Sequence, residues 1–120
     1  MASAAIEPFA RSRGYGVVPD WGGHGIGRVF HAPPHISHVV DAASTTVMRP
    51  GMVFTIEPMI NAGRRDIKEF GNDGWTIVTK DHSLSAQWEH TILVTPTGYE
   101  VMTLSAGSPA LPDFVTATST

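Results

Sequence analysis

The sequence of 120 residues contains no cysteine, and only 16% of its residues are charged. Without thiols, neither disulfide bonds nor thiolate metal sites can form, so any metal ligands must be oxygen atoms or imidazole nitrogens. The sequence also lacks a G-x-S-x-G segment, which would indicate a serine nucleophile. These absences argue against covalent catalysis by a thiol or by a serine of that type.

Long hydrophobic runs and clusters of basic residues are lacking as well. No stretch approaches the roughly 18 apolar residues of a membrane span. The net charge is −3, and Asp66 interrupts the short basic group of Arg64, Arg65 and Lys68, whereas phosphate backbones require a continuous basic surface. We therefore expect neither a membrane nor a nucleic-acid partner. No basic region followed by a hydrophobic stretch opens the chain, which favours a cytoplasmic location.

The length and an apolar content of 42% indicate one globular domain with a core of its own. A helix is predicted over residues 4–13, with Gly14 as its left-handed stop. Pro8 lacks a backbone N–H, so only about a turn and a half of this helix is secure. Residues 105–120 are rich in Ser, Thr, Pro and Ala and are expected to be disordered.

The rest of the chain is dominated by strand signals. We predict an extended segment over residues 15–20, a glycine-rich turn over 22–27, a long ordered loop over 28–50 and a charged connector over 64–74. The β-rich runs between turns predict consecutive antiparallel strands at Met52–Ile60, Trp75–Thr79, Ala86–Thr95 and Tyr99–Thr103. With the helix, this pattern indicates an α+β fold.

Two carboxylates lie inside these strand-like runs. Glu57 and Glu89 have apolar neighbours, and His24 lies among glycines upstream. Because a desolvated carboxylate costs several kcal/mol unless it is paired or coordinated, the first interpretation is a metal site. The alternatives are an edge acid facing water for Glu57, an outward-facing strand residue for Glu89 and a solvated loop residue for His24.

A series of histidines at i, i+4 and i+7, namely His31, His35 and His38, is a spacing that could place zinc ligands on a helix. The Pro33-Pro34 pair excludes a continuous helical face there. These are therefore predicted to be loop histidines, and His31, next to Phe30, is the best candidate for a contact with a substrate or with a metal ligand.

Taken together and in order, several segments resemble the C-terminal half of a type I methionine aminopeptidase. They are GHGIGR at 23–28, FH at 30–31, PGM at 50–52, FTIEPM at 54–59, DGWT at 73–76, TKD at 79–81 and SAQWEHT at 85–91. The resemblance covers roughly residues 4–104 and is far more specific than any single short motif. It implies that residues 1–104 form half of a pita-bread fold, a curved antiparallel sheet with a flanking helix.

The resemblance also implies a function, which is metal-dependent removal of the N-terminal methionine from nascent polypeptides. His24, Glu57 and Glu89 match three of five ligands of a centre for two divalent cations, of which Co, Mn, Fe and Zn all suit such donors. Glu57 also matches the general base that takes a proton from the attacking water. His31 matches a catalytic residue that contacts the substrate beside the scissile peptide bond.

Two further residues match walls of the pocket that holds the methionine side chain, namely Phe30 and Trp75. The family's other two ligands are aspartates of an N-terminal half, and no aspartate of this chain lies in the matching motifs. We therefore expect little or no activity from this chain without such a half. Alternatively, it is a non-catalytic interaction module or a gene fragment with an exposed half-domain face. Proline-specific peptidases, creatinase-like hydrolases and binding proteins share the architecture and form a third possibility.

Overall fold

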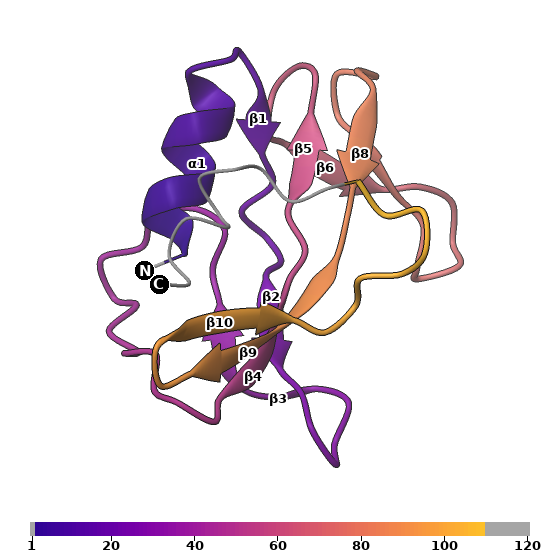
Figure 1. The fold of residues 1–120 in the computed structure, drawn as a ribbon. Coiled ribbons are helices and arrows are strands. Elements are labelled where there is room, and N and C mark those ends of the chain that lie inside the picture. The colour runs from indigo at the N-terminus through magenta and orange to yellow at the C-terminus, as the bar shows by residue number, and fades with distance from the viewer. Residues whose placement is uncertain (1, 110–120) are drawn as a thin grey trace.

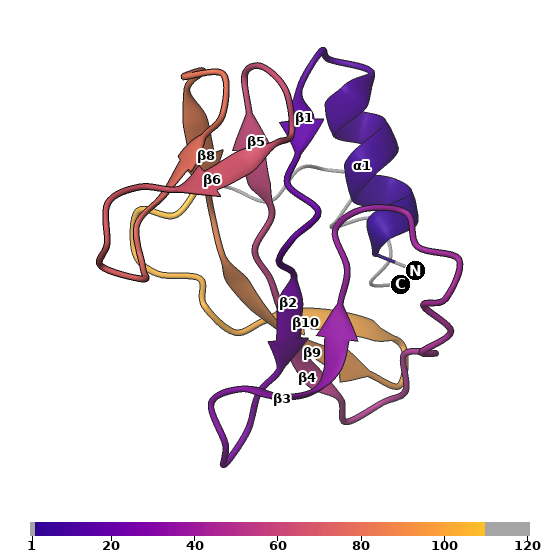
Figure 2. The ribbon, with the colours of Figure 1, turned by 180° about the vertical axis from the view of Figure 1, so that it is seen from behind.

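The computed structural model describes residues 2–109, which form one helix followed by ten short strands (Figures 1 and 2). The elements are α1 (Ser3–Arg11), β1 (Gly16–Val17), β2 (Gly23–Gly25), β3 (Ala32–Ile36), β4 (Val53–Ile56), β5 (Met59–Asn61), β6 (Ile67–Glu69), β7 (Ile77–Thr79), β8 (Ser85–Gln87), β9 (His90–Thr95) and β10 (Gly98–Val101). Most of the expected disordered tail, residues 110–120, lies outside the described residues, so that expectation stays a prediction.

All strand pairs in the described residues are antiparallel, and they form three sheets. The largest has the order β10-β9-β4-β2-β3, the second has the order β1-β5-β8, and β6 pairs with β7. The five-stranded sheet lies at one end of the molecule, and α1 lies beside the three-stranded sheet at the other end (Figure 1). The expected α+β class, with antiparallel sheets and a flanking helix, is confirmed.

The helix was predicted over residues 4–13 and is observed over Ser3–Arg11, so it extends beyond the turn and a half that the sequence made secure. Pro8 lies inside α1 and removes the N–H that would bond to the fourth carbonyl before it. The helix nevertheless continues, because the Pro8 carbonyl accepts the N–H of Ser12 at 3.0 Å and Ala10 is buried where α1 packs on β1. The expected stop is confirmed, since Gly14 adopts a φ of +80°.

Two of the predicted strands are each divided between two sheets. The run predicted over 52–60 forms β4 in the five-stranded sheet and β5 in the three-stranded sheet, and the run over 86–95 forms β9 and β8 in the same way. Pro58, between β4 and β5, has no N–H to donate to a ladder, which helps to explain the first break. The prediction of single strands was therefore wrong at both places.

The predictions of a glycine-rich turn over residues 22–27 and of a long loop over residues 28–50 were also wrong in part, because these segments contain β2 and β3. A Cβ on Gly23 would collide with the carbonyl oxygen of Thr55, so this glycine allows two strands to approach rather than the chain to turn. β3 contains Pro33-Pro34, joined by a cis peptide bond, and His35. It lies at the edge of its sheet, where a residue without an N–H is tolerated. Likewise, β6 occupies part of the predicted charged connector.

The buried core of the described residues is small and unusually polar. Its buried apolar residues are Ala10, Val17, Val18 and Phe54, and its buried polar or charged residues are Ser3, Glu7, His38, Thr55, Asn61 and Thr79. Several large aromatic side chains are exposed instead, including Phe30, Trp75 and Trp88. Within residues 2–109, no helix has the length and hydrophobicity needed to cross a membrane.

Candidate metal centre

The two carboxylates lie where the chain passes from one sheet to the other. β4 pairs with β9 and β5 pairs with β8 in one continuous register, and two residues in each of the two paired segments separate the two ladders. These residues are Glu57-Pro58 between β4 and β5 and Trp88-Glu89 between β8 and β9, which places Glu57 opposite Glu89. The strand breaks that the sequence did not reveal are thus the places where both acids lie.

His24 reaches the same point from the neighbouring strand. β2 pairs with β4 on the side away from β9, and the His24 N–H donates to Thr55 Oγ1 at 3.0 Å. Its Nε2 lies 3.5 Å from Glu57 Oε1. One potential ligand atom from each of His24, Glu57 and Glu89 lies within 4.8 Å of the others. The structure therefore brings together the three residues that the sequence singled out as metal ligands.

The chemistry of this group fits a divalent cation. Two carboxylates face each other, and within residues 2–109 no lysine or arginine forms an ion pair with either of them. Like charges placed opposite each other across a strand pair repel. The side chains of His24 and Glu57 are only 16% and 17% exposed, which strengthens that repulsion. A cation would relieve it, and a donor set of oxygen and imidazole nitrogen suits Mn, Fe, Co or Zn.

The orientation of the His24 ring also suits a metal ligand. Nδ1 lies 3.0 Å from the carbonyl oxygen of Gly25, and because a carbonyl only accepts hydrogen bonds, this contact requires the proton to be on Nδ1. In the neutral ring, Nε2 then carries a free lone pair directed towards Glu57. A hydrogen bond to the second nitrogen is the usual way in which proteins fix the tautomer of a ligating histidine.

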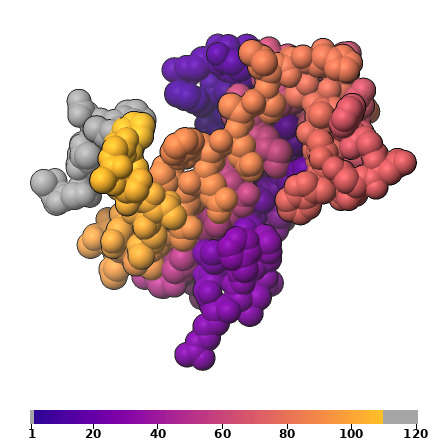
Figure 3. Space-filling model, turned by 90° about the vertical axis from the view of Figure 1, so that its right-hand side faces the viewer, coloured from indigo at the N-terminus to yellow at the C-terminus, as the bar shows by residue number. Residues whose placement is uncertain are grey.

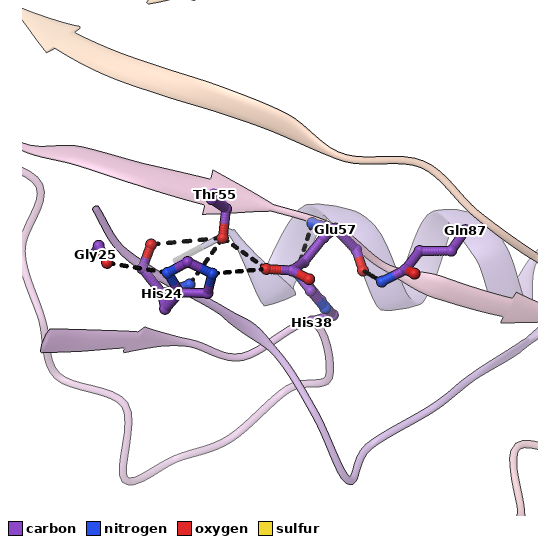
Figure 4. A network of polar contacts seen from close by, with 6 residues as sticks. All are labelled: His24, Gly25, His38, Thr55, Glu57 and Gln87. Atoms are coloured by element: carbon purple, nitrogen blue, oxygen red, sulfur yellow. Dashed lines mark hydrogen bonds and ion pairs between the residues drawn. The ribbon is translucent and has the colours of Figure 1, made fainter. Parts of the chain in front are cut away.

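Side chains replace the missing ladder around Glu57 (Figure 4). Its backbone N–H donates to His38 Nε2 at 3.1 Å, and its carbonyl accepts a hydrogen bond from Gln87 Nε2 at 3.1 Å. The Thr55 hydroxyl donates to Glu57 Oε1 at 2.7 Å. Glu57 is therefore fixed by three side chains at the point where β4 ends.

His38 lies in the loop after β3, as the sequence suggested, but it is buried and only 2% exposed. Burial lowers its pKa, an effect that outweighs the opposite influence of nearby Glu57 and is reinforced by His35. The neutral ring can then accept the Glu57 N–H. Sequence reasoning missed this role because the contact spans 19 residues. Thr55, by contrast, could have been found, since it lies two residues before Glu57 on the same strand face.

A cavity of about 650 Å³ opens beside two of the three candidate ligands, His24 and Glu57. His24, Glu57, His31 and Trp75 all line it, and Trp75 is 85% exposed. The sequence assigned no role in the site to several other lining residues, notably Asp20, Trp21, His35, Met59, Glu69 and Ile77.

Phe30 has a different position from the other candidate substrate residues. Its ring centroid lies 4.6 Å from that of His31 and 5.8 Å from that of His24, and the two histidine rings are 4.3 Å apart. Phe30 thus packs on both histidines from the end of the β2–β3 connection, which protrudes from the body of the molecule (Figure 3).

Comparisons with known proteins agree with this geometry. A sequence model of metallopeptidase family M24 matches residues 2–96. The methionine aminopeptidase of Escherichia coli (strain K12) is 52% identical over 101 residues, which are 84% of this chain and 38% of that protein. The methionine aminopeptidase of Haemophilus influenzae is 48% identical over 100 residues, which are 83% of this chain and 37% of that protein.

Solved structures show the same relationship. The methionine aminopeptidase of Rickettsia prowazekii superimposes with a TM-score of 0.81 at 50% identity, over 85% of this chain and 41% of that one. The enzyme of Thermotoga maritima gives a TM-score of 0.80 at 40% identity, over 86% and 41% of the two chains. These neighbours confirm the expected pita-bread architecture for the part that is present. This chain spans about 38% of the length of the curated relatives.

Proposed function

The chain belongs to metallopeptidase family M24, and from this premise we propose that it supplies metal ligands and substrate contacts to an aminopeptidase that removes N-terminal methionine from polypeptides. One observation supports this proposal above the others. The His24, Glu57 and Glu89 side chains, which come from three different strands or strand breaks, offer ligand atoms within 4.8 Å of one another. The cavity beside them gives a peptide access to that group.

We propose that these three residues are metal ligands. When bound there, divalent cations would lower the pKa of a water molecule and stabilise negative charge developing on a peptide carbonyl. Glu57 takes the proton of the attacking water, since it is the acid of this group that lies both on the cavity wall and next to His24. The bond from Thr55 occupies one position on Oε1, which leaves the second carboxylate oxygen for the proton.

The substrate contacts follow from the lining of the same cavity. We assign His31 to a hydrogen bond with the substrate beside the scissile peptide bond, because its ring lies 4.3 Å from that of His24 and lines the cavity. Trp75 and Met59 offer apolar surface for a methionine side chain. Phe30 supports this wall through its contact with His31.

The chain spans about 38% of the curated relatives it matches, so the activity of a whole enzyme is itself part of the proposal. We expect the described residues to form only part of the metal-binding site, with two further carboxylate ligands supplied by a partner polypeptide or segment. On this account the chain alone binds a cation and turns over peptide slowly. The cytoplasmic location expected from the sequence stays a prediction.

The proposal can be tested with the peptide Met-Ala-Ser and the control peptide Ala-Ala-Ser. In the presence of Mn²⁺, we expect tighter binding of Met-Ala-Ser, measured by the fluorescence of the exposed tryptophans, and slow release of methionine, measured by mass spectrometry. Glu57→Gln should stop the release. Equal binding of both peptides together with no release above the Glu57→Gln background would contradict the proposed activity. Rapid release would support the activity and refute the expectation of slow turnover.

A second candidate function is supported by the aromatic residues around the site. Phe30, Trp75 and Trp88 are 65%, 85% and 67% exposed, which is unusual for such large apolar side chains. They would suit a non-catalytic module that is covered by another protein. Metal-dependent methionine release by this chain would decide against that alternative.

A further inference from the structure

The described residues contain a set of side chains whose hydrogen bonds converge on Glu57 and His24 from outside the cavity. Thr55 is completely buried, and its hydroxyl contacts both residues. His38, which is also buried, accepts a hydrogen bond from the Glu57 backbone N–H. We propose that Thr55 and His38 are positioning residues, which fix the Glu57 carboxylate and the His24 backbone for metal binding. This inference rests on the proposed function only in taking the bound species to be a metal ion.

The Thr55 hydroxyl has a single proton, so it can donate fully to only one acceptor. Two acceptors compete for it, Glu57 Oε1 at 2.7 Å and the His24 carbonyl oxygen at 3.5 Å. The shorter bond to a carboxylate prevails, because hydrogen bonds to charged acceptors are the stronger ones. The lone pairs of the same oxygen accept the His24 N–H at 3.0 Å. One buried atom therefore links the backbone of one candidate ligand to the carboxylate of another.

His38 fixes the backbone of Glu57, whereas Thr55 fixes its carboxylate. In a continuous sheet, the Glu57 N–H would bond to a strand carbonyl, but β4 ends at Ile56. The imidazole takes the place of that carbonyl, at 3.1 Å. An unpaired N–H at this half-buried position would cost free energy comparable to a lost hydrogen bond. His38 therefore stabilises the strand break itself, and with it the position of the Glu57 Cα.

The segment that carries His38 is in turn attached to the helix. The Val40 N–H donates to Oε2 of Glu7 in α1 at 2.7 Å, and the Glu7 side chain is only 11% exposed. Oε1 of the same residue lies 3.8 Å from the guanidinium groups of Arg11 and Arg65. The hydrogen bonds thus run from α1 through the 37–40 segment to Glu57, without passing through the cavity. This arrangement gives His38 a fixed position independent of any bound ion.

The experiment combines a metal-free and a metal-dependent readout on the same chain. The variants are Thr55→Val, which keeps the shape and removes the hydroxyl, and Thr55→Ser, which keeps the hydroxyl. Thr79→Val is the matched control, since Thr79 is also buried and its hydroxyl donates to the Ser83 carbonyl at 2.8 Å, in a turn outside the candidate site. Amide hydrogen exchange without metal, and the Kd for Mn²⁺ from calorimetry, are measured for each variant.

We expect Thr55→Val to accelerate exchange of the His24 amide and to weaken Mn²⁺ binding by about 10- to 100-fold, the usual effect of losing a partner of a metal ligand. Thr55→Ser should restore both properties, and Thr79→Val should change neither. His38→Leu should accelerate exchange of the Glu57 amide, and His38→Gln, which offers an amide oxygen as acceptor, should slow it again. A role in overall stability alone would make Thr55→Val and Thr79→Val behave alike.

Two results would overturn the proposal. One is a Thr55→Val protein that retains both the His24 amide protection and the Mn²⁺ affinity of the wild type. The other is rapid exchange of the His24 and Glu57 amides in the folded wild-type protein, which would show that the two hydrogen bonds are not formed. A wild-type protein with both amides protected but no Mn²⁺ binding would instead refute the proposed metal centre and retain the hydrogen-bonded arrangement.

Discussion

The two strand breaks that carry the candidate carboxylate ligands differ in how firmly the structure holds them. At Glu57, the side chains of His38 and Gln87 replace the missing ladder bonds, Thr55 donates to the carboxylate, and the carboxylate is mostly buried. At Glu89, the carboxylate is exposed, and within residues 2–109 no hydrogen bond holds it. The neighbouring Trp88 is 67% exposed and donates only to His90. One side of the candidate centre is therefore preorganised, and the other must be ordered when a cation or a partner binds.

The largest effect on Mn²⁺ affinity should come from a substitution of Glu57, on the preorganised side of the candidate centre. Glu57→Gln removes a charge that the fold already holds in place, so we expect Mn²⁺ affinity to fall by about 100-fold or more, roughly 3 kcal/mol. Calorimetry measures this change directly. Glu100→Gln, which removes an exposed acid from β10, is the control for the loss of one negative charge. Equal losses in both variants would mean that net charge, rather than a ligand at Glu57, governs the affinity.

The next largest effect is expected on stability, from a substitution that disturbs the packing between β2 and β4. In Gly23→Ala, the new methyl group collides with the carbonyl oxygen of Thr55, and the resulting shift should cost about 1–3 kcal/mol of the free energy of unfolding. Gly27→Ala is the control, because a Cβ there meets no atom within 4 Å. Denaturant unfolding measures both. Equal stabilities for the two variants would show that β2 and β4 are not held at this separation.

Glu89→Gln should have a smaller effect than Glu57→Gln. An exposed glutamate loses up to about 2 kcal/mol of side-chain entropy when it becomes ordered, which offsets part of what the ligand contributes. We expect Mn²⁺ affinity to fall by about tenfold, or roughly 1.4 kcal/mol. If calorimetry instead shows Glu89→Gln to be as damaging as Glu57→Gln, the difference between the two strand breaks has no energetic consequence.

The smallest effect concerns a carboxylate that is held by hydrogen bonds outside the candidate centre. The N–H of Arg64, with further bonds from Ser83, lowers the pKa of Asp81 to about 2. A lowered folded-state pKa stabilises the fold above the unfolded value near 4 and loses this contribution as the pH falls towards 2. Asp81→Asn should therefore flatten the acid side of the stability curve, measured by thermal unfolding from pH 5 to pH 2, and leave Mn²⁺ affinity unchanged.

The sequence predicted the class of the fold and the residues that meet at its centre, but not how they are held. β-rich runs revealed most of the strands, because alternation and turn residues are local signals. The break at Glu57 was missed, since it depends on how two sheets meet. The glycines around His24 were taken for a turn, whereas Gly23 is required by the approach of β4.

The position of His38 could not be predicted from its neighbours either. Its segment is attached to α1 by the hydrogen bond between Val40 and Glu7, which joins residues 33 positions apart. A proline pair upstream made this region look irregular, although β3 is an edge strand that accommodates it. Long-range contacts of this kind carry no local sequence signal. Thr55 is the exception, because its spacing of two from Glu57 places both side chains on one face of the strand.

The most direct test of the metal centre is anomalous X-ray diffraction from crystals of this chain grown with Mn²⁺. The account predicts an anomalous peak among the side chains of His24, Glu57 and Glu89, and no peak there in crystals of Glu57→Gln. An occupied Mn²⁺ site elsewhere in the chain, with no density among these three side chains at saturating Mn²⁺, would contradict it.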